Sequence, residues 1–149
     1  IPKNLPPGPL GQRTGNRVIQ VSTLRPGLSD AVEGDVKGAA IRWRETVETS
    51  AEVLARFSNG DPALTESGNM LYLACWADEE LLTGVLTLAA RKAGLETLSL
   101  PAHIRIRRRG NLTFAFNYGT EAWPIPQEAS VLFGQAVLEP QAVSAWKHA

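Results

Sequence analysis

Basic and aromatic residues alternate in one short stretch, HIRIRRRGNLTFAFNYG, which spans residues 103–119. Four of its residues are arginines that fall within five positions: Arg105, Arg107, Arg108 and Arg109. Arginines can neutralise phosphates and aromatic rings can stack on bases, so this composition suits a nucleic-acid groove. The same composition is also found on the outside of a β-hairpin, and the register of the hairpin distinguishes the two.

The spacing of the apolar residues predicts a hairpin with a three-residue loop at residues 108–110. Five apolar residues are expected on one face: Ile104, Ile106, Leu112, Phe114 and Phe116. A three-residue loop pairs Ile106 with Leu112 and places Gly110 at the left-handed position that this loop requires. We therefore expect the phenylalanines in the core and the arginines on a solvated surface, with no nucleic-acid partner.

The charge balance also argues against a nucleic-acid partner. The 149-residue chain has 15 basic and 15 acidic side chains. Up to residue 100 the counts are 10 and 12, and beyond it they are 5 and 3. Neither part has the strong positive field that non-specific binding to nucleic acid requires. The longest apolar run is far shorter than the roughly 20 residues that span a bilayer, so no membrane partner is expected.

Residues suited to catalysis or metal binding lack partners at the required spacing. His103 and His148 have neither a metal-site nor a triad pattern around them. Three glycines near the N-terminus fit no phosphate-binding fingerprint: Gly8, Gly11 and Gly15. The serines lack a GxSxG motif. The single cysteine, Cys75, lies in the apolar run MLYLACWA, where we expect a buried and inert thiol suited to a reducing compartment.

Two pairs of carboxylates are candidates for glycosidase residues. The two carboxyl groups of such a pair must face each other across a sugar. Glu79 and Glu80 are adjacent and better explained as acids at the start of a helix. Glu45 and Glu48 are expected on opposite faces of a strand. The sequence thus predicts no catalytic residue, no cofactor-binding residue, no metal ligand and no cofactor.

Four tryptophans leave a second reading open, that of a carbohydrate-binding module. They are Trp43, Trp76, Trp123 and Trp146. They are scattered through apolar strand contexts, which favours packing or interface burial over a sugar platform.

The pattern of apolar residues indicates an α+β chain. We expect an extended arm over the first 16 residues, a strand at 17–24, a polar loop to residue 40 and a strand at 41–50. Asn59-Gly60 predicts a hairpin turn, and a turn at 67–69 leads into one continuous apolar strand, 70–77. Asp78 can cap a helix that Gly94 ends. Strand followed by helix suggests a βα unit of a mixed or parallel sheet, and beyond Pro101 a small antiparallel β domain is expected.

Five segments in order resemble the C-terminal region of family-42 glycoside hydrolases, the bacterial β-galactosidases. They are LRPGL (24–28), RWRE (42–45), AEVLARFSNGDPAL (51–64), LYLACWADEELL (71–82) and LPAHIRIRRRGNLTFAFNYG (100–119). Together they cover roughly residues 20–120, and their order is more specific than any one of them.

The resemblance implies a supporting role and no chemistry in this chain. In that family a (β/α)8 barrel carries two catalytic glutamates, an α/β domain mediates trimer formation, and a small antiparallel β domain ends the chain. Residues 1–100 would be the back half of the trimerisation domain and residues 101–149 the small β domain. The expected partners are the catalytic barrel and further copies in a trimer, and the expected location is the cytoplasm. The barrel motifs match nothing here, and the chain lacks an initial Met, so we expect a fragment or a processed product.

Overall fold

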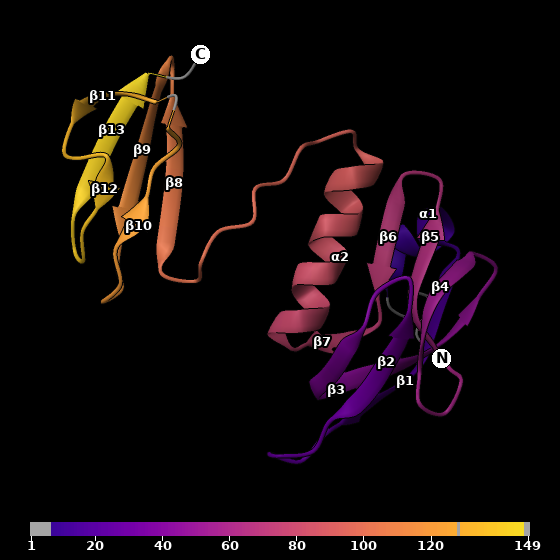
Figure 1. Ribbon diagram of the computed structural model, residues 1–149. Coiled ribbons are helices and arrows are strands. Elements are labelled where there is room, and N and C mark those ends of the chain that lie inside the picture. Colours follow the sequence, from indigo (N-terminus) through magenta and orange to yellow (C-terminus); the bar gives the residue numbers. More distant parts are fainter. Residues whose placement is uncertain (1–6, 128, 148–149) are drawn as a thin grey trace. The chain divides into compact units, whose positions relative to one another are not determined.

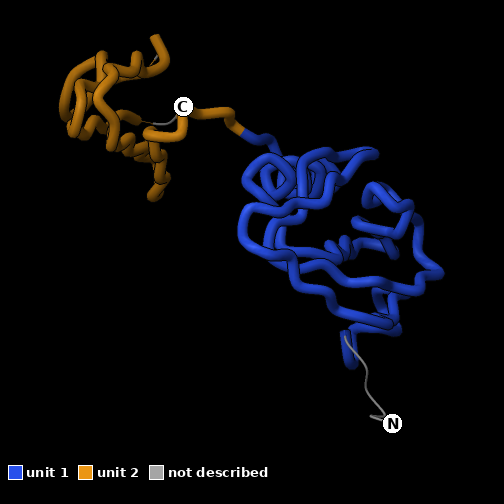
Figure 2. Tube along the Cα trace, turned by 90° about the horizontal axis from the view of Figure 1, so that it is seen from below, with its two compact units in different colours: residues 1–97 blue, residues 98–149 orange. Residues whose placement is uncertain are grey.

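The computed structural model describes residues 7–127 and 129–147. The chain divides into two compact units, residues 1–97 and 98–149, which Figure 2 shows in different colours. Each unit is described by itself. Within the described residues, no helix combines the length and the hydropathy needed to cross a membrane.

Unit 1 is built on one antiparallel sheet (Figure 1). Its strands are β1 (Asn16–Thr23), β2 (Asp30–Gly34), β3 (Gly38–Thr49), β4 (Glu52–Phe57), β5 (Pro62–Ser67), β6 (Met70–Leu73) and β7 (Cys75–Ala77). The hydrogen-bonded order is β1-β3-β2-β4-β5-β6, and β7 pairs with β3. The predicted turn at Asn59-Gly60 joins β4 to β5, and Gly68-Asn69 joins β5 to β6.

The sheet closes on itself at Ala74, the one residue between β6 and β7. The Ala74 amide donates to the carbonyl of Ala63 on β5 (N···O 2.9 Å). The Ala74 carbonyl accepts from the amide of Glu45 on β3 (2.7 Å). Strands β3, β2, β4, β5 and the β6–β7 segment therefore form a ring around a core that includes Val32, Leu54, Phe57 and Leu64. β1 pairs with β3 only and stands at the end of the strand order.

Helix α2 (Glu79–Lys92) begins and ends as the sequence predicts. Asp78 is the N-cap, and its carboxylate accepts from the amide of Leu81 at 2.8 Å. Leu81, Val85 and Leu88 are buried in the core of unit 1. Asp78 also joins the helix to the sheet, since its amide donates to the carbonyl of Ala39 on β3 (2.8 Å).

The structure confirms the α+β class but corrects several elements. All strand pairs are antiparallel, so the predicted βα unit of a mixed or parallel sheet is wrong. The predicted polar loop contains β2, which was missed because Val32 is its one buried side chain. The predicted strand 70–77 is interrupted at Ala74. The predicted arm contains a 3-10 turn, η1 (Gly8–Leu10), and a short helix, α1 (Gly11–Thr14); residues 1–6 lie outside the described part.

Unit 2 consists of short antiparallel strands. They are β8 (Ile104–Arg109), β9 (Leu112–Asn117), β10 (Trp123–Pro124), β11 (Ser130–Phe133), β12 (Val137–Leu138) and β13 (Val143–Lys147). A four-stranded sheet has the order β11-β13-β9-β8, and β10 pairs with β12. The buried core is small and includes Ile104, Leu138 and Trp146.

Gly38 allows α2 to pack closely on the sheet, and replacing Gly38 is expected to destabilise unit 1. Its φ is +141°, and an added Cβ would lie 2.6 Å from the Leu81 nitrogen and 2.7 Å from an Asp78 carboxylate oxygen. We expect Gly38→Ala to lower the free energy of unfolding by about 3 kcal/mol or more, because backbone strain and a clash with the helix cap combine.

The matched control is Gly27→Ala, since Gly27 also has a positive φ, +83°, but nothing lies within 4 Å of its added Cβ. It should cost only about 1 kcal/mol of backbone strain. Urea unfolding followed by tryptophan fluorescence measures the free energy of unfolding of both variants. Equal decreases in the two variants would contradict the role of Gly38 in packing α2 on the sheet.

Candidate functional site

The arginine hairpin has a different register from the predicted one. β8 and β9 pair Arg109 with Leu112, which leaves a two-residue loop, Gly110-Asn111. Gly110 takes the first loop position with a φ of +59°, as a type II′ turn requires. Arg107 lies opposite Phe114, so the predicted three-residue loop and the predicted burial of the phenylalanines are both wrong.

This register places arginines and aromatic rings on one face of the four-stranded sheet. Arg105 lies opposite Phe116 on β9, and Phe116 in turn lies opposite Val143 on β13. The rings of Phe116 and Tyr118 stack with centroids 6.4 Å apart. Phe133, on β11, keeps 65% of its surface exposed. Both Arg105 and Arg107 also donate to nearby backbone carbonyls, which holds the guanidinium groups close to their own strand.

The predicted register is wrong because the largest apolar residues of β9 do not face the core. On β9 the buried residues are the smaller ones: Thr113, Ala115 and Asn117. Asn117 is held there because its side-chain amide donates to the carbonyls of Glu121 (2.7 Å) and Leu138 (3.1 Å). Trp146 fills the space above these small residues and is itself 6% exposed. No sequence periodicity distinguishes these two registers.

The carboxylates considered for catalysis are engaged in separate contacts. Glu45 accepts a hydrogen bond of 2.5 Å from the Tyr72 hydroxyl. Burial, followed by the hydrogen bond and the negative charge of Glu45, raises the pKa of Tyr72 well above its ordinary value. Glu48 pairs with Arg17 on the exposed edge of β1 and β3. Glu79 and Glu80 lie in the first turn of α2, as predicted.

Arg44 forms an ion cluster that the sequence analysis did not identify. Its guanidinium lies 2.8 Å from a carboxylate oxygen of Asp30 on β2 and 3.5 Å from one of Asp61 in the β4–β5 turn. It also lies over the Phe57 ring, 4.8 Å from its centroid. The Arg44 side chain is 18% exposed, so the cluster is largely shielded from water. Its position suits a structural clamp between β2, β3 and the β4–β5 turn.

Cys75 is buried, as predicted, and faces the core of unit 1. Burial raises the pKa of the Cys75 thiol to about 12, and the negative charges of Asp78, Asp30 and Glu45 add to the shift. A thiol is nucleophilic only as the thiolate, so Cys75 is poorly suited to covalent chemistry.

Two of the tryptophans come together in unit 2, where Trp123 packs against the core cluster that contains Trp146. His103 precedes β8 and its carbonyl accepts from the Tyr118 amide, while His148 lies outside the described residues. Trp146 is buried, Trp43 and Trp123 are half-buried, and Trp76 is 48% exposed with Arg42 placed 5.1 Å from its ring centroid. Among the described residues, no three metal-binding side chains gather in one place.

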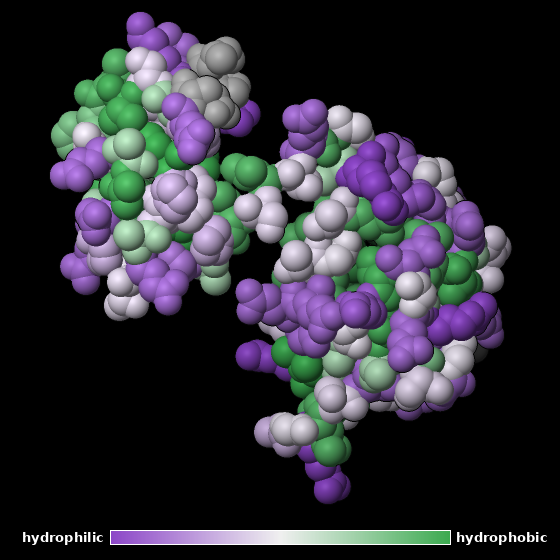
Figure 3. Space-filling model, in the orientation of Figure 1, coloured by the Kyte–Doolittle hydropathy of each residue, from purple (hydrophilic) through white to green (hydrophobic). Residues whose placement is uncertain are grey.

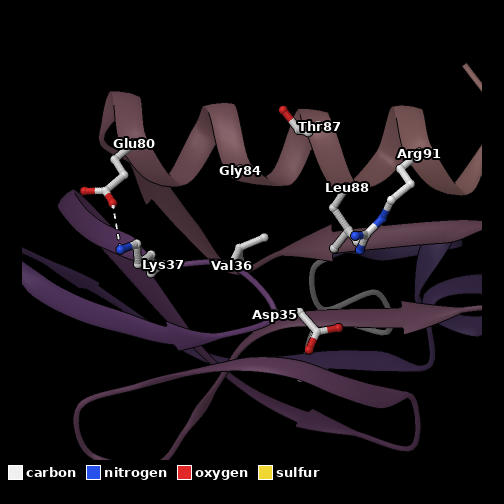
Figure 4. Close-up of a pocket in the computed structure, with 8 residues that line it drawn as sticks. All are labelled: Asp35, Val36, Lys37, Glu80, Gly84, Thr87, Leu88 and Arg91. Carbon is white, nitrogen blue, oxygen red and sulfur yellow. Dashed lines mark ion pairs between the residues drawn. The ribbon is translucent and has the colours of Figure 1, made fainter. Parts of the chain in front are cut away.

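A hollow of about 350 Å³ lies between α2 and the loop that joins β2 to β3. Its lining residues are Asp35, Val36, Lys37, Glu80, Gly84, Thr87, Leu88 and Arg91. Figure 4 shows Glu80 turned toward Lys37, with their charged atoms 3.9 Å apart, and the Asp35 carboxylate pointing away from the helix. Both members of the ion pair are more than half exposed. The hollow thus presents balanced, solvated charges, and its two carboxylates do not converge.

Several known proteins that this chain matches are β-galactosidases. Residues 1–96 match the family model of the β-galactosidase trimerisation domain. The whole chain is 42% identical, over 152 residues, to a β-galactosidase of Thermus thermophilus and covers 24% of that protein.

The chain belongs to the β-galactosidase trimerisation-domain family. This confirms the resemblance drawn from the five sequence segments. The chain spans about a quarter of the length of the relatives it matches.

Solved β-galactosidases share the fold of this chain along nearly all of its length. The β-galactosidase from the psychrophilic Marinomonas ef1 superposes with a TM-score of 0.94 at 35% identity, covering all of this chain and 23% of that one. The enzyme of the haloarchaeon Halorubrum lacusprofundi superposes over 97% of this chain and 24% of its own with a TM-score of 0.87; at 22% identity, this likeness concerns the fold alone.

Removing Arg44 is expected to cost far more stability than removing an exposed arginine. In Arg44→Met the carboxylates of Asp30 and Asp61 lose their shared cation in a shielded place, and the free energy of unfolding should fall by about 3 kcal/mol. Arg17→Met removes an ion pair whose side chains are 59% and 63% exposed, so it should change stability by less than about 1 kcal/mol. Chemical unfolding compares the variants, and equal effects would show that the Arg44 cluster is not a clamp.

The Cys75 thiol should resist alkylation in the folded chain. The stability gained from keeping it protonated is complete below pH 9 and is lost as the pH rises from 9 toward 12. At pH 9 we expect iodoacetamide to modify the folded chain at least about a hundredfold more slowly than the urea-unfolded chain. Mass spectrometry follows the modification, and similar rates in the two states would contradict the described burial.

Proposed function

We propose that this chain is a non-catalytic part of a β-galactosidase that supports the enzyme's assembly and its catalytic barrel. The observation that carries the proposal is the full-length match to β-galactosidases over only a quarter of their length. The contacts of the acidic residues agree with it, because Glu45, Glu48 and Glu80 each engage a separate tyrosine, arginine or lysine. None of these contacts supplies the facing pair of carboxyl groups that glycoside hydrolysis needs.

In this proposal, residues 1–100 are the back half of the trimerisation domain and residues 101–149 a small antiparallel β domain. Its partners are the catalytic barrel of the parent enzyme and two further copies in a trimer. No residue of the chain is catalytic or binds a metal or cofactor, no nucleic acid or membrane is a partner, and the parent enzyme works in the cytoplasm.

An activity assay tests the non-catalytic role. The chain, purified from a host that lacks its own β-galactosidase, should not cleave a chromogenic β-galactoside above the rate of a mock purification. The reason is that Glu45, Glu48 and Glu80 are engaged with Tyr72, Arg17 and Lys37, respectively. Turnover that co-purifies with the chain and disappears in a carboxylate variant such as Glu45→Gln or Glu80→Gln would contradict the proposal.

Carbohydrate binding is a second candidate, because Trp76 keeps 48% of its surface exposed. Arg42 lies over that ring, where a sugar would otherwise stack. The assembly role is therefore preferred, and tryptophan fluorescence titrated with galactosides to millimolar concentration distinguishes the two. A saturable change that is lost in Trp76→Ala would favour the binding module.

A further inference from the structure

Helix α2 has an apolar arc much wider than the one the sheet covers. At 3.6 residues per turn, successive residues are about 100° apart around the axis. The buried residues Leu81, Val85 and Leu88 occupy an arc of roughly 60°. Beyond Val85 the helix surface stays apolar for roughly a further 100°, over Ala89, Leu82, Leu86 and the C-cap residue Ala93. We call these four residues the α2 outer face. Lys92 projects within the buried arc, where it pairs with Glu66.

The α2 outer face carries no charge, and all of its residues except the half-buried Ala89 are exposed. Leu82 and Leu86 keep 47% and 60% of their surface in solvent, and Ala93 is also exposed. A helix that lies on a single core usually places polar or charged residues outside its buried stripe. The opposite flank of α2 follows that rule, since Glu80 and Arg91 line the hollow there (Figure 4). The asymmetry indicates that a partner covers the outer face.

A second apolar surface lies on β1, the strand at the end of the sheet order. Ile19 and Val21 are 47% and 55% exposed, and residues 18–24 contain no charged side chain. Four other large apolar residues are exposed in the described part of unit 1, if α2 and residues 93–97 are left aside. Each of them occurs singly along the chain: Leu10, Leu28, Ile41 and Trp76. Figure 3 shows apolar residues reaching the surface among hydrophilic ones. We call Ile19 and Val21 the β1 surface.

Both surfaces lie within residues 1–96, the part that matches a trimerisation domain. A closed ring of three copies needs two different, complementary surfaces on each copy, because its contacts are head-to-tail. We propose that the α2 outer face of one copy packs on the β1 surface of the next copy. The proposal rests on the assembly role given above and specifies the surfaces that carry it. Neither surface has a charge that would lose its hydration in this contact.

Single substitutions that place a charge on either surface test the contact. The chain should sediment as a trimer, and Leu86→Glu or Val21→Glu should weaken the assembly at least about tenfold in dissociation constant, because each buries a carboxylate against apolar residues. Leu132→Glu is the matched control, since Leu132 on β11 is 55% exposed and lies in neither surface. Far-UV circular dichroism and thermal melting check that all variants keep their fold.

Mixing the two variants gives the sharpest result. Leu86→Glu keeps an intact β1 surface and Val21→Glu keeps an intact α2 outer face, so one good contact can form between them. The mixture should therefore form a one-to-one dimer that cannot grow, at a protein concentration where each variant alone is mostly dissociated.

The outcomes distinguish the proposed contact between the α2 outer face and the β1 surface from the assembly role. A trimer that neither substitution weakens, or a mixture that yields no dimer, overturns the proposed contact and leaves the assembly role standing. A chain that is monomeric at every concentration overturns both.

Discussion

The fold of unit 1 depends on the closure of its strand ring, which the backbone of Ala74 and the pairing of β7 with β3 bring about together. The amide and the carbonyl of Ala74 point to different strands and join β5 to β3 across the break between β6 and β7. Without this junction, the amide and the carbonyl of the buried Ala74 would be unpaired, which is costly in a core. Closure of the ring surrounds the core with strands, and the Ala74 side chain is itself buried to 1% exposure.

The ring also suits the supporting role proposed for the unit. Its interior is filled by apolar side chains, while Arg44 ties neighbouring elements together beside the Phe57 ring. Polar groups that could react are held in stabilising contacts, such as the hydrogen bond between Tyr72 and Glu45. Exposed apolar surfaces of the unit lie on α2 and β1. This distribution agrees with membership in a family described by its role in assembly.

The sequence predicted the elements that local rules determine and missed those that depend on distant contacts. The cap at Asp78 and the turn at Asn59-Gly60 follow from neighbouring residues, and both are present. The antiparallel closure at Ala74 depends on carbonyl and amide partners 11 and 29 positions away in the chain, which no local pattern reveals. The hairpin of unit 2 was predicted in the wrong register because Asn117 is buried through hydrogen bonds to residues beyond its own strand. The Arg44 cluster was missed for the same reason.

Amide hydrogen exchange tests most directly whether a closed ring supports this assembly role. In the ring, the amides of Ala74 and Glu45 both donate across the junction, so they should rank among the slowest to exchange in unit 1 at every protein concentration. The amides of residues 19–23 should slow further as the concentration rises and copies cover β1. Fast exchange at Ala74 and Glu45, comparable to that of the loop residues 25–29, would contradict the closed ring and the account built on it.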